Sequence, residues 1–310
     1  MKIAGAPISW GVCEVPGWGY QMTPERVLTE MKEIGLTATE FGPQGWLPLD
    51  AEARGKEVAK YDLDVVGAFF LAIMHDPKVD PIPAVEKELD AFEVAGGKYL
   101  ILAADSGAEG YDSRPVLDEK GWETLFTNLD RISAVCAKRN VIACLHPHWG
   151  TMVQNVDEVE RVMDNSKVGL CLDTGHLACG GADVVALVSK YANRVDVVHA
   201  KDIHKEMTDK LLPGELKWGE GVRAGMFAPI GEGDMDFGAI VKKLNEVGFD
   251  GYWVLEQDIM IDGEPPAGGG PVIDVKKSLE ALRALASIEL LSLTRLHLDL
   301  GEWTGLKTST

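Results

Sequence analysis

Eight short apolar runs recur along the chain, and each is followed by a polar turn and a stretch with helical periodicity. Consecutive apolar residues are typical of strands that are buried on both faces. Strands that alternate with helices predict parallel βαβ units, and eight such units can close into an α/β fold of the (β/α)8 TIM-barrel type. The runs cover residues 3–9, 38–42, 64–70, 99–104, 141–146, 168–173, 195–200 and 252–257.

The stretches between the runs are predicted helices, and several begin at an N-cap residue and end in Gly or Asn. The clearest cover residues 23–35, 83–97, 122–140, 155–165, 182–194, 236–248 and 274–286, with a weaker one after the loop at 43–50. The alternative is an open doubly wound sheet, which usually carries a glycine-rich phosphate loop after an early strand. The segment SWGVCEVPGWGY (9–20) does not match such a loop, so we expect a barrel.

The eight units predict one catalytic domain over residues 1–287, followed by a C-terminal extension at 288–310. This extension could pack on the barrel or form a subunit contact in a homo-oligomer, either a dimer or a tetramer. Two long connections, 202–235 and 259–273, follow the last two strands. Connections this long in a compact domain are usually functional, and both would lie at the active face of a barrel.

The composition of the chain limits the kinds of molecule that it is expected to bind. The chain has 30 Lys and Arg against 49 Asp and Glu, a formal charge of −19, so we expect no nucleic-acid partner and no anionic membrane surface. No apolar run approaches the roughly 20 residues that span a bilayer, and the N-terminus lacks the apolar core of a signal peptide. The five cysteines include no CxxC pair and are expected to be reduced, as in a cytoplasmic protein.

Polar side chains gather where the predicted strands end, at the edge that becomes the mouth of a barrel. These residues are Glu40, His146, His148, Asp173, His176, His199, Lys201, Asp202, Glu256 and Asp258. Two imidazoles and two carboxylates from four consecutive strands form a set that could bind a divalent metal. The predicted ligands are His146, Asp173, His199 and Glu256. Such a set suits Mn, Fe, Co or Zn better than Ca.

Each ligand also has a purely structural interpretation. A single strand-end histidine is more often a hydrogen-bonding structural residue, and Asp173 could cap the next turn. Glu256 is different because it ends the apolar run YWVL, where an unpaired carboxylate costs several kcal/mol. His146 and His148 share one face of a strand and compete for the ligand position. The coincidence of four such residues is a stronger signal than any one of them.

Other residues could contact a substrate. Lys201 follows His199 by two residues and could hold a substrate oxygen or stabilise an enolate, or it could pair with Asp202. Arg223, in the long connection, could reach over the mouth. Trp10 and Trp46 could line a polyol pocket, although each could equally be a packing residue.

The motifs LDTGH (172–176), HAKD (199–202), PIGEGDMDF (229–237) and VLEQD (254–258) resemble, in order and spacing, the xylose-isomerase-like barrel superfamily of sugar isomerases and epimerases. The resemblance extends from residue 3 to about residue 286. Three further features are similar to the myo-inosose-2 dehydratase group of inositol catabolism. They are APISWG (6–11), TEFGPQGWLP (39–48), and LHPHWGTMVQ (145–154) joined with VRAGMFAPIGEGDMDF (222–237).

The resemblance implies dehydration of 2-keto-myo-inositol to a trihydroxycyclohexane-dione, with Mn or Co as the metal and Zn, Fe or Mg as alternatives. Many epimerases and hydroxypyruvate isomerases of the superfamily have Glu at the position of His146. One carboxylate fewer argues against a symmetrical proton shuttle and for an elimination. We expect His148 and Glu40 near the proton transfers, and His176 and Arg223 on substrate hydroxyls.

Four alternatives stay open. A ketose 3-epimerase could use the same metal site, as could the catalytic subunit of a C-glycoside deglycosidase, which works with a small β subunit. An AP-endonuclease-like hydrolase needs a trinuclear metal site and a basic DNA groove, and the charge of −19 argues against it. A non-enzymatic sugar-binding barrel has no reason to keep metal ligands at four strand ends.

Overall fold

The computed structural model describes the backbone of residues 1–304 and the side chains of residues 1–288. Nine parallel strand segments form one sheet in the order β3-β2-β1-β11-β8-β7-β6-β5-β4. These segments are β1 (Lys2–Gly5), β2 (Ala38–Thr39), β3 (Asp64–Val65), β4 (Gly67–Ala72), β5 (Tyr99–Ala104), β6 (Ile142–Leu145), β7 (Gly169–Asp173), β8 (Val195–Ala200) and β11 (Tyr252–Leu255). Every predicted run contributes to this sheet.

The sheet closes on itself because its two end segments are consecutive in the chain. Only Val66 separates β3 from β4; its N–H donates to Thr39 O, and its carbonyl accepts from Lys98 N and Tyr99 N. The bent segment from Asp64 to Ala72 thus pairs with β2 on one side and with β5 on the other. The bent segment counts as one strand, so the closed ring has eight strands. The predicted (β/α)8 barrel is confirmed.

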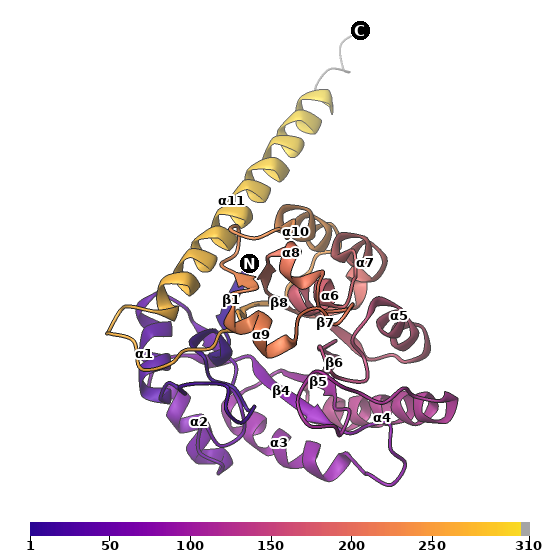
Figure 1. Ribbon diagram of the computed structural model, residues 1–310. Coiled ribbons are helices and arrows are strands. Elements are labelled where there is room, and N and C mark those ends of the chain that lie inside the picture. Colours follow the sequence, from indigo (N-terminus) through magenta and orange to yellow (C-terminus); the bar gives the residue numbers. More distant parts are fainter. Residues whose placement is uncertain (305–310) are drawn as a thin grey trace.

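Helices surround the ring of strands (Figure 1). The longer ones are α1 (Pro24–Glu33), α2 (Ala51–Ala59), α3 (Ile82–Ala95), α4 (Glu119–Lys138), α5 (Val156–Asn165), α7 (Val184–Tyr191), α10 (Phe237–Glu246) and α11 (Pro271–Thr304). Most begin where the sequence offers a cap: side chains such as those of Asp118, Asn155 and Asp236 accept from the first turn. Short helices η1 (Pro7–Trp10), α6 (Thr174–Cys179) and η2 (Ala192–Arg194) lie between strands and longer helices.

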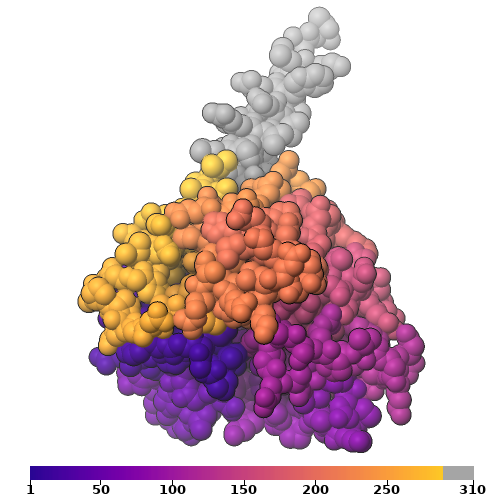
Figure 2. All heavy atoms as spheres, in the orientation of Figure 1, coloured from indigo at the N-terminus to yellow at the C-terminus, as the bar shows by residue number. Residues whose placement is uncertain are grey.

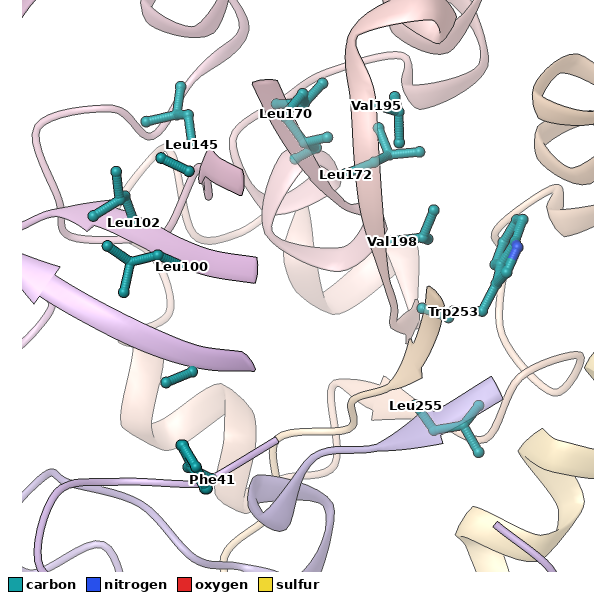
Figure 3. Close-up of a cluster of buried hydrophobic side chains, with 14 of the residues drawn as sticks. Phe41, Leu100, Leu102, Leu145, Leu170, Leu172, Val195, Val198, Trp253 and Leu255 are labelled. Atoms are coloured by element: carbon teal, nitrogen blue, oxygen red, sulfur yellow. The ribbon is translucent and has the colours of Figure 1, made fainter. Parts of the chain in front are cut away.

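The core has two layers. Small and branched side chains fill the inside of the ring, among them Ala4, Cys144 and Val197. A larger layer lies between the strands and the helices, and it includes the side chains labelled in Figure 3. This division explains why the strands are apolar on consecutive residues: each strand buries one face inside the ring and the other under helices.

Three predicted bounds are wrong. The first strand ends at Gly5, because Pro7 starts the 3-10 turn η1, so residues 7–9 are not extended. The third strand is interrupted at Val66. The last helix starts at Pro271 and continues to Thr304, since no Gly or Pro interrupts residues 288–300. The predicted boundary at 287 therefore falls inside one helix. The proposed role of residues 288–310 stays a prediction, because side chains after residue 288 and all of 305–310 lie outside what the structure describes.

The connection between β8 and α10 is folded rather than irregular. It contains β9 (Asp202–Ile203) paired antiparallel with β10 (Phe227–Ala228), and the short helices α8 (Lys205–Thr208) and α9 (Trp218–Arg223). The buried carboxylate of Asp202 accepts from the backbone N–H groups of Gly231, Gly233 and Met235 and thereby fixes the PIGEGDMDF turn. In Figure 2 the connection is the orange surface, bordered by the indigo N-terminal segment and the magenta middle of the chain.

No helix in the described part of the chain is long and apolar enough to cross a membrane.

A carboxylate near the start of β8, at the barrel end opposite the mouth, predicts a pH-dependent stability. Burial raises the pKa of Asp196 to about 6. Because the folded pKa lies above the unfolded one, the contribution of the protonated group to stability is present below about pH 4 and is lost as the pH rises through about 6. A two-unit shift corresponds to about 3 kcal/mol, which partial exposure reduces to about 1 kcal/mol.

Asp196→Asn is therefore expected to stabilise the metal-free protein at pH 7.5, raising Tm by roughly 2 °C, with a smaller gain at pH 4.5. Thermal unfolding at the two pH values measures this. Asp250→Asn is the control, because an ion pair with Lys2 lowers the pKa of Asp250 and its loss should not stabilise. An equal gain for Asp196→Asn at both pH values would exclude ionisation as the cause.

Candidate active site

Four predicted ligands meet at the mouth of the barrel. His146 directly follows β6, Asp173 ends β7, His199 lies in β8, and Glu256 directly follows β11. One ligand atom from each lies within 4.8 Å of the others. His146 Nε2 is 3.1 Å from His199 Nδ1 and 3.3 Å from Asp173 Oδ2, and Glu256 Oε2 contacts His199 Nδ1. Parallel strands end at one edge, so their terminal side chains converge on one point.

The donor atoms of this cluster fit a divalent metal. Asp173 is buried and Glu256 is partly buried, and one buried oxygen of each, Asp173 Oδ2 and Glu256 Oε2, has no hydrogen-bond partner in the described structure. Buried oxygens of this kind are costly unless a cation or donor completes them. A second grouping combines Cys171 with the two histidines, but it leaves both orphaned oxygens without a partner. The residues present therefore fit the predicted two-histidine, two-carboxylate set.

Asp173 has both of the roles that the sequence suggested, as a helix cap and as a member of the cluster. Its Oδ1 accepts the backbone N–H of His176 at 2.7 Å and caps α6. Its Oδ2 faces the two ligand imidazoles. The cap fixes the rotamer of the carboxylate, and so it orients the free oxygen toward the cluster.

Glu40 is brought to the cluster, but it contacts a ligand rather than standing free. Its Oε1 lies 2.8 Å from His199 Nε2. With Nδ1 directed at the cluster, Nε2 carries the proton and donates it to the carboxylate. This arrangement is common behind metal-bound histidines, where the carboxylate fixes the ring orientation and raises the basicity of the ligand nitrogen. Glu40 also lines the pocket above the cluster, and its predicted place near the proton transfers stays a prediction.

Lys201 is completely buried under the cluster. Its Nζ lies 2.8 Å from Asp258 Oδ1 and 3.4 Å from both Asp173 Oδ2 and Glu256 Oε1. Although burial alone would lower the pKa of Lys201, these carboxylates raise it above its ordinary value. One lysine cannot balance Glu40, Asp173, Glu256 and Asp258, so the site has excess negative charge that a divalent cation would offset.

Two further histidines form one wall. The rings of His148 and His176 lie against each other with centroids 3.9 Å apart and planes tilted by 34°. The backbone of Trp149 contacts both: His148 Nδ1 lies 2.7 Å from the Trp149 carbonyl oxygen, and the Trp149 N–H donates to His176 Nδ1 at 3.2 Å. The first contact requires a proton on His148 Nδ1, which leaves Nε2 with a free lone pair. The second contact requires an unprotonated His176 Nδ1, which places the proton on Nε2.

Burial keeps both of these imidazoles neutral. It lowers the pKa of His148 to about 3 and that of His176 well below the ordinary histidine value. Asp258 lies next to them, with Oδ2 3.8 Å from His176 Nε2. Burial raises the pKa of Asp258 to about 7, against the opposing charge of Lys201 and with the help of Glu256. The wall thus combines two neutral rings with a carboxyl group of raised pKa.

A pocket of about 570 Å³, partly open to solvent, lies over the cluster. Its polar lining residues are Glu14, Glu40, Tyr111, His148, Glu256 and Asp258, and Trp18, Phe69 and Trp218 are among the apolar ones. The Trp218 ring is stacked on His176 with centroids 4.9 Å apart. This mixture of acidic and aromatic side chains suits a small ligand with hydroxyl groups.

Three residues predicted to bind substrate are not brought to this pocket. Trp10 is buried in the core, where its Nε1 donates to Glu30. Trp46 packs against the main core, and its Nε1 donates to Met22 O. Arg223 is exposed and pairs with Asp262. The sequence placed each of them in a segment near the mouth but could not give the direction of the side chain.

Among the pocket residues that sequence reasoning missed are Glu14, Trp18, Tyr111 and Trp218. All lie in connections that follow strands β1, β5 and β8 at their carboxyl ends. Their position after a strand was the available signal. It was weak, because most residues of such long connections point elsewhere.

Comparisons with known proteins agree with this fold. Residues 28–285 match the family model described as xylose isomerase-like TIM barrel. An inosose dehydratase from Clostridium perfringens is 30% identical over 269 residues, which is 83% of this chain and 90% of the relative.

Two solved structures share the fold at low identity. A zinc-bound IOLI protein has a TM-score of 0.67 at 12% identity, covering 93% of this chain and 98% of that one. An L-ribulose 3-epimerase has a TM-score of 0.64 at 15% identity, covering 99% of both chains. The family match spans most of the barrel, and it agrees with the resemblance inferred from the strand-end motifs. The chain is therefore an enzyme of the xylose isomerase-like TIM barrel family, related to the inosose dehydratases.

Proposed function

We propose that the protein is a hydro-lyase that converts 2-keto-myo-inositol to a trihydroxycyclohexane-dione and water. The observation that carries this proposal is the wall beside the metal ligands, where the backbone N–H and carbonyl of Trp149 give His148 and His176 opposite tautomers. An elimination needs one group that accepts a proton and one that donates a proton, and this wall offers both. The named relatives support the same reaction class.

The metal ligands in this proposal are His146, Asp173, His199 and Glu256, with Mn or Co as the preferred ion and Zn, Fe or Mg as alternatives. A divalent cation bound there supplies Lewis acidity, which makes the C–H next to a ketone more acidic. The chain's own residues orient the ligands and balance their charge. Glu40 holds the ring of His199, and Lys201 offsets the negative charge of the carboxylates around it.

His148 accepts the proton from the carbon next to the ketone. Its Nε2 has the free lone pair, its ring lines the pocket, and the Trp149 carbonyl prevents the ring from turning over. A neutral imidazole in a buried wall can take up a proton without first losing one. The C–H bond breaks, and its electron pair moves into the bond between that carbon and the ketone carbon, which gives an enolate. When the ketone re-forms, the pair moves into the bond to the next carbon, and the hydroxyl on that carbon leaves.

The pair His176 and Asp258 serves the departing hydroxyl on the next carbon. Asp258 lines the pocket, and His176 Nε2–H lies behind it. The C–O bond breaks, and a proton from this pair converts the leaving hydroxide to water. The enol that results isomerises to the dione, so the overall change is the loss of one water from the keto-polyol.

An epimerisation fits the geometry less well. Proton transfer between two faces of one carbon needs a base on each side of the substrate. Glu40, one of the carboxylates that line the pocket, already accepts from His199 Nε2. The position that would add another carboxylate to the cluster is occupied by His146.

The test is to incubate the Mn²⁺-loaded protein with 2-keto-myo-inositol and to follow the absorbance of the dione, with NMR identification of the product. We expect dione formation and no epimerised ketose. No dione together with epimerisation of a free ketose would overturn the proposal. A requirement for a second, smaller protein for any turnover would instead favour the C-glycoside deglycosidase.

A further inference from the structure

Two residues from distant loops meet above the pocket. Tyr111 OH donates a hydrogen bond to Glu14 Oε1, which joins the loop after β5 to the loop after β1. Both side chains line the pocket, and the Tyr111 ring lies 4.7 Å from the ring of His148, centroid to centroid. We call Glu14 and Tyr111 the roof pair. Neither is a proposed metal ligand or part of the proposed proton transfers.

The Tyr111 loop is held firmly in place. Gly150 has φ +75°, and a Cβ on it would lie 2.6 Å from Tyr111 Cα, so the backbones approach as closely as a glycine permits. Next to Tyr111, Asp112 Oδ1 accepts the backbone N–H of Trp218 at 2.9 Å. Arg114 bonds Thr151 O at 3.2 Å. A residue fixed by three neighbouring segments can determine the shape of the pocket.

The roof pair offers acceptors but no free strong donor. Tyr111 has one O–H, and it is used by Glu14 Oε1, which leaves the lone pairs of the phenol oxygen. The second oxygen of Glu14 has only a weak contact, from Cys13 Sγ at 3.6 Å. An acceptor-only surface binds O–H groups and leaves a phosphate or carboxylate without a partner.

The charges around the pocket also disfavour an anionic ligand. Four carboxylates line it, those of Glu14, Glu40, Glu256 and Asp258, and no lysine or arginine does so among the residues that the structure describes. The nearest cation, Lys201, is buried and already in contact with three carboxylates. An anionic group entering past Glu14 would meet like charge at short range.

We propose that the roof pair recognises a hydroxyl of an uncharged polyol and excludes phosphate esters and carboxylates from the pocket. This inference rests on the proposed function for the orientation of the substrate, with its ketone toward the metal ligands and a ring hydroxyl toward the roof. It adds a restriction on substrate class that the metal cluster alone does not impose.

Kinetics of the Mn²⁺-loaded protein test the recognition. Tyr111→Phe is expected to raise KM for 2-keto-myo-inositol about tenfold, the effect of one lost hydrogen bond, with kcat changed less than about threefold. Glu14→Gln should give the same pattern, since it weakens the acceptor. A matched Tyr–Glu pair outside the pocket, Tyr20 and Glu264, provides the controls Tyr20→Phe and Glu264→Gln, which should leave KM unchanged. An unchanged KM in the Tyr111 variant, or a fall in kcat alone, would overturn the recognition role.

Calorimetry tests the exclusion independently of turnover. At low ionic strength, where charges are least screened, myo-inositol should bind at least about 100-fold more tightly than myo-inositol 1-phosphate. Glu14→Gln should reduce that ratio about fivefold or more, and Glu264→Gln should not. Equal or tighter binding of the phosphate would overturn the exclusion. If 2-keto-myo-inositol is not turned over, the proposed function fails, whereas the ratio of the two affinities still decides whether the pocket selects uncharged polyols.

Discussion

Glu256→Gln is expected to abolish metal binding and to lower activity about a thousandfold or more, while the barrel remains folded. The change removes one of two anionic ligands and keeps the size of the side chain. Even partners behind a ligand change metal affinity about 10- to 100-fold, so loss of a direct carboxylate ligand should exceed that range. Loss of the Lewis acid removes several kcal/mol of stabilisation from the transition state.

Metal binding is measured by titration and by the rise in Tm that the metal produces. Saturating metal at 100 times Kd stabilises the folded state by about 2.7 kcal/mol, and this increment should disappear in Glu256→Gln. Glu30→Gln is a matched control, because Glu30 is also buried but contacts Trp10 and Arg26 far from the cluster. It should lower stability and keep the metal-dependent rise. If Glu256→Gln retained both metal and full activity, Glu256 would not be a ligand.

His148→Asn is expected to reduce kcat about 10²- to 10⁴-fold with metal affinity unchanged, which is the range of a lost general base. Asparagine can still donate a hydrogen bond to the Trp149 carbonyl, as His148 Nδ1 does, but it has no lone pair in place of Nε2. The substitution therefore removes the proposed base without removing the contact that positions it.

Two measurements separate this effect from a general loss of structure. In D2O, exchange of the proton next to the ketone, followed by NMR, should fall together with kcat. Metal titration should match that of the unchanged protein, and His204→Asn, outside the pocket lining, should behave as the unchanged protein does. Exchange at the normal rate in His148→Asn would mean that another residue removes the proton.

The expected behaviour of these variants depends on features that the sequence predicts to different degrees. The strand rhythm predicts the barrel, and the barrel predicts the cluster. His146, Asp173, His199 and Glu256 each occur where an apolar run ends, and parallel strands bring such positions together whatever the loops do. Asp173 was expected to be either a cap or a site residue, and it uses one oxygen for each.

Residues in connections were predicted less well. Arg223 and Trp46 lie in segments near the mouth, yet each forms its polar contact elsewhere, with Asp262 and with Met22 O. Trp10 directly follows the first predicted strand, but the 3-10 turn that starts at Pro7 directs it into the core. A side chain in a connection is directed by its packing partners, and those partners are distant in sequence.

The sequence by itself determined the eight-stranded barrel and the identity of the residues at its mouth. The periodicity of apolar residues and the position of a residue at the end of a strand can both be read from a short stretch of sequence. Only the tertiary structure decided the tautomers of His148 and His176, the contact of Glu40 with His199, and the meeting of Glu14 with Tyr111. Each of these depends on atoms from segments that closure of the ring brings within hydrogen-bond distance, the last pair across 97 residues of chain. Hydrogen bonds of this kind act over about 3 Å, and no local pattern encodes them.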